Sequence, residues 1–159
     1  MAIIGVIAEK DEEVFIKKYI ERNIEERATV LFLHEKTIQN IKNILFETII
    51  ITRNFANEIT LKEILKNVQY LVINSDLPNI LKLLDGIDAL IITYGFNPKA
   101  TITASSVTKE NMVICLQRDV ENKRGQIIET QEIKIETKKD VYMIMACYAI
   151  KIMYHKKKT

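Results

Sequence analysis

Glycine is scarce in this chain of 159 residues, which contains only four. The turn after the first strand of an α/β protein holds a phosphate when glycines let backbone N–H groups approach it and a lysine supplies charge. Here the turn that follows Ala8 has no glycine, and four of the five residues in 9–13 are carboxylates. The chemistry of this turn is therefore wrong for a phosphate.

Cysteine and histidine are also rare, with two of each. Cys115 and Cys147 lie far apart inside apolar segments, which indicates buried, reduced thiols of a cytosolic protein; a disulfide or a catalytic thiol is the alternative. His34 and His155 form no metal-ligand spacing. We therefore expect no bound metal, no cofactor and no catalytic residue.

Neither sign of charge dominates, because 23 Lys and Arg residues face 21 Asp and Glu residues. A nucleic-acid-binding protein usually has a basic face with interleaved aromatic side chains, and the lysines at 156–158 are more typical of a solvated tail. The most apolar late stretch, 141–153, is shorter than the roughly 20 residues that span a bilayer. The apolar N-terminus lacks the basic residues of a signal peptide. We expect a soluble, cytoplasmic protein that binds no nucleic acid.

The sequence does contain a regular alternation of short apolar segments and segments of helical period. Five segments are apolar throughout and are expected to be strands: 3–8, 29–33, 48–52, 70–73 and 89–93. Strands that are buried on both faces and separated by helices predict a largely parallel sheet with right-handed crossovers. Among the helices, the first is expected to be capped by Asp11, and the third to begin with a capping box of Thr60 and Glu63.

The pattern changes after Gly95. Three further segments, 101–107, 112–118 and 127–136, are expected to be strands, and the alternation in the last is typical of a half-exposed antiparallel strand. Asp140 can cap a final helix that is apolar nearly all round and is therefore buried in the domain or at an interface. We predict one α/β domain over 1–159. Its parts are a mostly parallel Rossmann-like sheet flanked by helices (1–95), a small antiparallel β extension (96–137) and an apolar C-terminal helix (138–155).

Two strand endings carry a family resemblance. The strings Leu71–Asp76 (LVINSD) and Ile91–Gly95 (IITYG) resemble the Asn-x-Asp and Thr-x-Gly-like endings in the central, ATP-binding domain of Mur ligases. These are the ATP-dependent amino-acid-adding enzymes of peptidoglycan synthesis. The resemblance implies that a small antiparallel sheet and an alanine-containing apolar helix follow, at 100–136 and 141–154. An unrelated doubly wound sheet with similar strand endings is the alternative.

The resemblance fails at the phosphate loop, which would follow Ile4-Gly5-Val6. Both loop glycines are missing, the family's phosphate lysine falls on Glu12, and its magnesium-binding hydroxyl falls on Glu13. Carboxylates at this helix N-terminus would repel a triphosphate. The family's metal ligands, its modified lysine and its two other domains also have no counterpart. The resemblance thus implies a degenerate, stand-alone Mur-ligase-like domain without a usable phosphate loop.

Ligands of an open parallel sheet bind at the carboxyl ends of its strands. Six residues near those ends are the candidates for ligand binding: Lys10, Arg53, Asn74, Asp76, Thr93 and Tyr94. Asn74 and Asp76 could hold a ribose, a base or a loop, or Asp76 could only cap a helix that begins near Pro78. Lys10 and Arg53 could hold an anion, or they could form surface ion pairs with Glu9 or Asp11.

These features favour a non-catalytic, Mur-ligase-like binding or regulatory module, connected with the cell envelope, that has lost ATP-dependent ligation. The alternative is a Rossmann-like protein that binds a small molecule or nucleoside, or a divergent enzyme, at the ends of its strands. A third hypothesis is a structural subunit whose apolar final helix forms a homodimer. The expected partner is accordingly another protein, a second copy of the chain or a small molecule.

Overall fold

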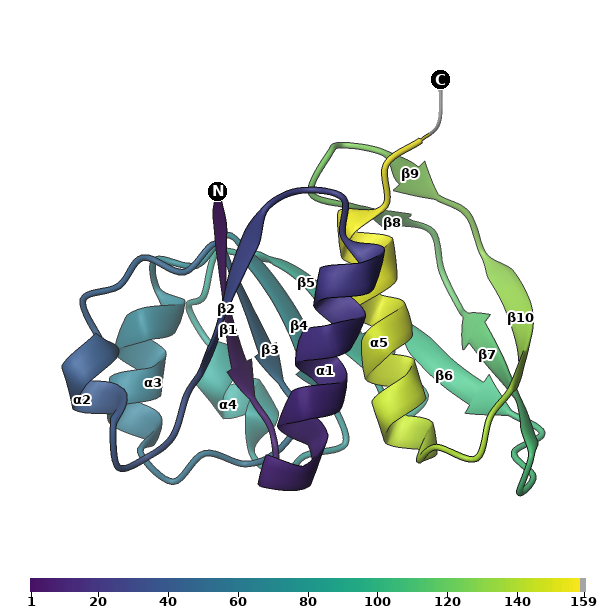
Figure 1. Cartoon of the computed structure of the whole chain (residues 1–159), viewed down its shortest axis with the longest axis horizontal. Helices are drawn as coiled ribbons and strands as arrows, with labels where there is room; N and C mark the ends of the chain where they lie inside the picture. Colours follow the sequence, from purple (N-terminus) through teal and green to yellow (C-terminus); the bar gives the residue numbers. More distant parts are fainter. Residues whose placement is uncertain (158–159) are drawn as a thin grey trace.

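A computed structural model describes residues 1–157, so Lys158 of the basic tail and Thr159 lie outside the described residues. Eight strands form one sheet with helices on both faces (Figure 1). The strands of this sheet are β1 (Ala2–Ile7), β2 (Ala28–Phe32), β3 (Thr48–Ile51), β4 (Tyr70–Asn74), β5 (Leu90–Tyr94), β6 (Ile102–Ser105), β7 (Asn111–Leu116) and β10 (Gln131–Glu136). The helices are α1 (Lys10–Asn23), α2 (Ile38–Ile41), α3 (Glu58–Leu65), α4 (Ile80–Leu84) and α5 (Val141–Tyr154).

The strand order in the sheet is β10-β7-β6-β5-β4-β3-β1-β2. Strands β1 to β5 pair in parallel, which confirms the predicted parallel sheet. β6 joins β5 in parallel, and β7 and β10 then add in antiparallel orientation. The antiparallel strands therefore extend the main sheet.

The segment 127–136 is two strands and not the one that was predicted. Its first part, β9 (Ile127–Ile128), pairs with β8 (Val120–Glu121) in a separate two-stranded sheet, and only its second part continues the main sheet as β10. The small hairpin of β8 and β9 lies beside the end of α5 (Figure 1).

The parallel strands are buried on both faces because a hydrophobic core lies on each side of the sheet. In β3, Ile50 faces the core under α1 and α5, whereas Ile49 and Ile51 face the core under α2, α3 and α4. The strands are apolar at consecutive positions, and not only at alternate ones, because both faces are covered.

The final helix α5 packs on β4, β5 and β6 and against α1. Ten of its 14 residues are buried within the chain, so its apolar surface is already covered. Burial within the chain thus accounts for these apolar residues without a second copy, and the homodimer remains a prediction. Its predicted cap is confirmed, since a carboxylate oxygen of Asp140 accepts hydrogen bonds from the N–H groups of Tyr142 and Met143. No helix among residues 1–157 is long and apolar enough to cross a bilayer.

Two predicted helix starts are wrong. α1 begins at Lys10 with Glu9 in the N-cap position and no side-chain cap, so Asp11 lies inside the first turn. α3 begins before the expected capping box, and the side chain of Asn57 accepts a hydrogen bond from the N–H of Thr60 at 3.2 Å. In both cases an earlier polar residue takes the cap position, because the connection from the preceding strand is shorter than the pattern suggested.

Candidate functional site

The connection at the position of the expected phosphate loop is only two residues long. β1 ends at Ile7 and α1 begins at Lys10, so Ala8 and Glu9 alone join them. A phosphate cradle needs a longer loop, whose successive N–H groups can surround the phosphate oxygens. The side chain of Lys10 is exposed at the first helical position. This lysine belongs to α1, and the two-residue connection forms no loop that could place it over a bound phosphate.

Carboxylates surround the N-terminus of α1. Burial raises the pKa of Glu12, against the effect of a backbone hydrogen bond at Glu9, and the charges of Asp11, Asp140 and Glu9 raise it further. Asp140 contributes because α5 begins at the same edge of the sheet as α1 (Figure 1). Carboxylates thus occupy this helix N-terminus, where the helix dipole alone would favour a bound anion.

An ion pair crosses the carboxyl ends of β1 and β3, where the strand order reverses. Arg53 follows β3, and its guanidinium nitrogens Nη1 and Nη2 donate to the two carboxylate oxygens of Glu35 at 3.0 Å each. Its Nε also donates to the carbonyl oxygen of Ala8 at 3.2 Å. Sequence reasoning proposed Glu9 or Asp11 as the partner, and the actual partner is Glu35. Arg53 therefore ties three connections together at the point where ligands of such sheets usually bind.

This ion pair predicts an acid-dependent loss of stability. Hydrogen bonds from Arg53 lower the pKa of Glu35 to about 2, although partial burial opposes them. A lowered pKa stabilises the folded chain above the ordinary value of 4.5, and this contribution is lost as the pH falls from 4.5 toward 2. We expect the stability difference between the natural chain and Glu35→Gln, measured by urea unfolding, to shrink over that range.

The matched control for this prediction is Glu21→Gln, because Glu21 is half exposed and lies 4.0 Å from its partner Lys17. Its stability difference should be small at every pH in that range, since exposed ion pairs contribute little. A Glu35→Gln difference that does not change with pH would contradict the account.

Asp76 follows β4, and its carboxylate links this segment to the segment after β5 and to α5. Its carboxylate accepts hydrogen bonds from the backbone N–H groups of Phe96 (2.7 Å) and Asn97 (3.0 Å), and from the side-chain amide of Asn97 (2.7 Å). The hydroxyl of Tyr142, in the first turn of α5, donates to the same carboxylate at 2.8 Å. The buried side chain of Asn74 accepts from the N–H of Asp76 at 3.0 Å. The side chains of both predicted ligand residues thus form hydrogen bonds within the chain and not with a ligand.

The hydrogen-bond donors around Asp76 favour its charged carboxylate over the protonated form. Burial alone would raise its pKa, but the hydrogen bonds from Phe96, Asn97 and Tyr142 hold the pKa below its ordinary value. A Cβ atom at Gly95 would lie 2.6 Å from the carboxyl group, so only glycine fits beside it. Asp76 does not cap α4, which begins after Asn79 without a side-chain cap.

The last two predicted residues, Thr93 and Tyr94, belong to β5. The hydroxyl of Thr93 accepts a hydrogen bond from the N–H of Thr101 at 3.0 Å and so helps to dock β6. The side chain of Tyr94 is fully buried in the core. The structure therefore brings Asn74, Asp76, Thr93 and Tyr94 together on adjacent strands, but their polar groups face other parts of the chain or the core.

Sequence reasoning missed a second polar cluster. It lies at the other end of the parallel strands, where β2 and β3 begin. Lys123, in the turn between β8 and β9, donates to both carboxylate oxygens of Glu26 (2.8 and 3.0 Å) and of Glu47 (2.9 and 3.0 Å). The hydroxyl of Tyr154 also donates to Glu47 at 3.0 Å. The partners of Lys123 are 97 and 76 residues away in the sequence. No local pattern could have joined them.

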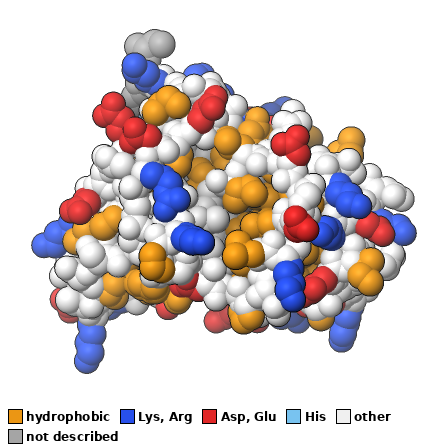
Figure 2. All heavy atoms as spheres, turned by 180° about the vertical axis from the view of Figure 1, so that it is seen from behind, with side chains coloured by type: hydrophobic (Ala, Val, Ile, Leu, Met, Phe, Trp, Pro, Cys, Tyr) orange, Lys and Arg blue, Asp and Glu red, His pale blue; other side chains and the backbone are white. Residues whose placement is uncertain are grey.

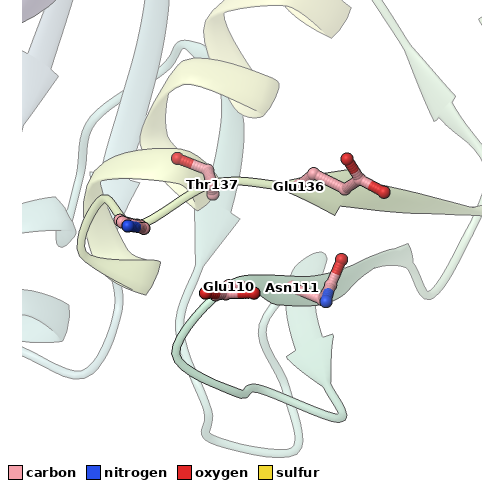
Figure 3. A pocket seen from close by; sticks show the side chains of 5 residues that line it. Glu110, Asn111, Glu136 and Thr137 are labelled. Atoms are coloured by element: carbon pink, nitrogen blue, oxygen red, sulfur yellow. The ribbon is translucent and has the colours of Figure 1, made fainter.

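Three hollows among the described residues, of about 440, 530 and 540 Å³, are not lined by any of the six predicted residues. One of about 440 Å³ lies at the outer edge of the sheet, between the start of β7 and the end of β10 (Figure 3). Glu110, Asn111, Glu136, Thr137 and Lys138 line it. Among residues 1–157, no group of three or more His, Cys, Asp or Glu side chains is placed to hold a metal ion.

The face behind the sheet carries apolar side chains near its middle and charged ones around them (Figure 2). Two strongly exposed apolar residues, Ile59 and Leu81, belong to α3 and α4, the helices of this face.

The strand order and the helices on both faces define a Rossmann-like α/β fold. No known protein family and no curated protein matches this chain by sequence. By structure the chain is similar to a UDP-N-acetylmuramoyl-L-alanyl-D-glutamate–2,6-diaminopimelate ligase, with a TM-score of 0.62 and 9% sequence identity. The similarity covers 94% of this chain and 42% of the ligase, so the chain spans less than half of the ligase's length. The fold is thus Mur-ligase-like.

Proposed function

We propose that the chain is a non-catalytic binding or regulatory module with a Mur-ligase-like fold that does not bind a nucleoside triphosphate. The observation that carries this proposal is the two-residue connection between β1 and α1, which has no glycine and is followed by three carboxylates at 11–13. A P-loop needs several consecutive N–H groups that point to one phosphate, together with a lysine and a hydroxyl. This chain has neither the loop length nor the charge for it.

The bridge from Arg53 to Glu35 supports the same proposal. A ligand at the carboxyl ends of β1 and β3 would have to displace two charge-assisted hydrogen bonds and the bond to the Ala8 carbonyl. Such bonds are among the strongest that side chains form. The alternative of a small-molecule or nucleoside site at Asn74 and Asp76 is weaker, because both side chains already serve internal hydrogen bonds. Lys10 is the one predicted site residue whose charged group points into solvent without such a role.

A role at the cell envelope rests only on the fold of the ligase to which the chain is similar. In this proposal the chain binds another protein, and the apolar side chains on the face of α3 and α4 are the part of the surface most suited to such contact (Figure 2).

Thermal unfolding with Mg-ATP, ADP, adenosine, UDP-sugars and phosphate tests the proposal. A ligand that binds only the folded chain raises its stability by about 2.7 kcal/mol when present at a hundredfold excess over its dissociation constant. We expect no shift with Mg-ATP, ADP or phosphate. A shift with adenosine alone would favour the nucleoside-binding alternative, and a ligase activity that depends on Mg-ATP would overturn the proposal.

A further inference from the structure

The strand β10 is an open edge of the main sheet. It stands at one end of the strand order and forms the outer margin of the molecule beside β7 (Figure 1). The N–H of Thr137 donates to the carbonyl oxygen of Glu110 at 2.8 Å, and in an antiparallel ladder the residues that bond to one neighbour alternate with those that do not. The backbone N–H and C=O groups of Glu132, Lys134 and Glu136 therefore point away from β7. A row of such groups is a template for another strand.

The side chains along this edge alternate in charge. The charged residues are all exposed, and they are Glu132, Lys134, Glu136 and, just after the strand, Lys138. They alternate with the isoleucines of β10, which pack against the core under α1 and α5. Because successive side chains of a strand point to opposite faces, the charged side chains of β10 share the face away from that core. Among residues 1–157, none of these four charged groups forms an ion pair.

This row of charges is complementary to a second copy of itself in antiparallel orientation. In the register that places Ile135 opposite the partner's Ile135, Lys134 lies opposite the partner's Glu136. In the same register Glu132 lies opposite the partner's Lys138. A two-fold axis repeats each of these pairs, and opposite charges directly across two antiparallel strands stabilise the pairing.

The same charges disfavour the neighbouring registers within β10. A two-fold axis at Lys134 would place like charges opposite each other, Lys134 against the partner's Lys134 and Glu132 against the partner's Glu136, which destabilises a sheet. An axis at Ile133 would keep only the pair of Glu132 with the partner's Lys134. Charges on an edge strand commonly prevent association with other chains. Their alternating sign here favours one register, the one about Ile135.

We propose that two copies of the chain associate through β10, antiparallel and about Ile135, so that their main sheets join edge to edge. The two Ile135 residues form a pair without hydrogen bonds between them, the kind of pair in which opposite side chains lie closest. The contact is one strand from each copy, so the dimer belongs to the weak, reversible class. This edge is separate from the residues that carry the proposed function, and the inference does not depend on that function.

Sedimentation equilibrium of the whole chain, from micromolar to millimolar concentration, tests the proposal with two charge-reversed variants. Lys134→Glu and Glu136→Lys each place like charges opposite each other on both sides of the axis, so each should weaken dimerisation about tenfold or more. An equimolar mixture of the two variants should dimerise as well as the natural chain, because each copy then meets the opposite charges in the other. The double variant Lys134→Glu/Glu136→Lys should dimerise for the same reason.

The matched control is Lys18→Glu, which makes the same change of charge at an exposed site on α1 and should leave dimerisation unchanged. The melting temperature of each variant chain, measured at a concentration where it is monomeric, should stay close to that of the natural chain, since the exchanged side chains are exposed. A natural chain that stays monomeric at millimolar concentration would overturn the proposal. A dimer that survives both single variants, or a mixture that stays monomeric, would overturn it as well.

Discussion

Lys123→Ala is expected to lower the free energy of unfolding by about 3 kcal/mol, because the partly buried carboxylates of Glu26 and Glu47 lose the cation they share and only Glu26 keeps another one, Arg124. The side chain of Lys123 is only 10% exposed, and its ammonium group pairs with the carboxylates of both Glu26 and Glu47. Burial opposes the charge on Lys123, but the hydrogen bonds to the two glutamates hold its pKa above the ordinary value. Urea unfolding at neutral pH measures the loss.

The control for this prediction is Lys17→Ala, which removes an exposed lysine that lies 4.0 Å from Glu21. Exposed pairs of this kind contribute about 0.5 kcal/mol or less. If the two variants lose the same small amount, the cluster around Lys123 does not fasten the hairpin of β8 and β9 to the sheet, and our account of this edge is wrong.

Asp76→Ala is expected to have the second large effect, a loss of about 3 kcal/mol, because several partly buried donors lose their acceptor at once and each hydrogen bond to a charged group contributes about 1.5–3 kcal/mol. The variant leaves the N–H groups of Phe96 and Asn97 and the hydroxyl of Tyr142 without their acceptor. Urea unfolding measures the loss, and hydrogen exchange should show faster exchange at the amides of Phe96 and Asn97.

Tyr142→Phe is the matched control, since it removes only one of the hydrogen bonds that Asp76 accepts. Its expected loss is about 1 kcal/mol, the net contribution of a typical hydrogen bond. A small loss in Asp76→Ala with unchanged exchange at both amides would mean that the carboxylate is free to bind a ligand, and the interpretation of Asp76 as a fastening residue would fail.

The main sheet could be predicted because the pattern that indicates each parallel strand lies within a few consecutive residues. Each parallel strand is a short segment that is apolar at every position, and burial on both faces of the sheet explains that pattern. The cap of α5 by Asp140 was likewise readable, since the polar residue stands directly before a long apolar segment. The segment 127–136 was misread because no glycine or proline marks the break between β9 and β10, where Glu129 and Thr130 lie.

The sequence predicts where the candidate residues lie in the fold, but it does not predict which groups they bond to. The strand ends place Asn74 and Asp76 at the carboxyl ends of the parallel strands. The groups that donate hydrogen bonds to Asp76, however, come from distant segments. Tyr142 is 66 residues from Asp76 in the sequence. The pairing of Arg53 with Glu35, and not with the acidic residues of the turn after β1, depends on how three connections meet in space.

The missing phosphate loop is the clearest agreement between sequence and structure. The sequence shows a turn without glycine and with carboxylates, and the structure adds that only Ala8 and Glu9 separate β1 from α1. Composition and geometry therefore both argue against a bound triphosphate at this edge.

The most direct test of this claim is isothermal titration of the whole chain with Mg-ATP at physiological salt. We predict no saturable heat, because the connection offers no cradle of N–H groups and the carboxylates around α1 repel the phosphates. Saturable binding of one Mg-ATP per chain that is lost in Lys10→Gln would contradict the account, since it would place a phosphate at the N-terminus of α1.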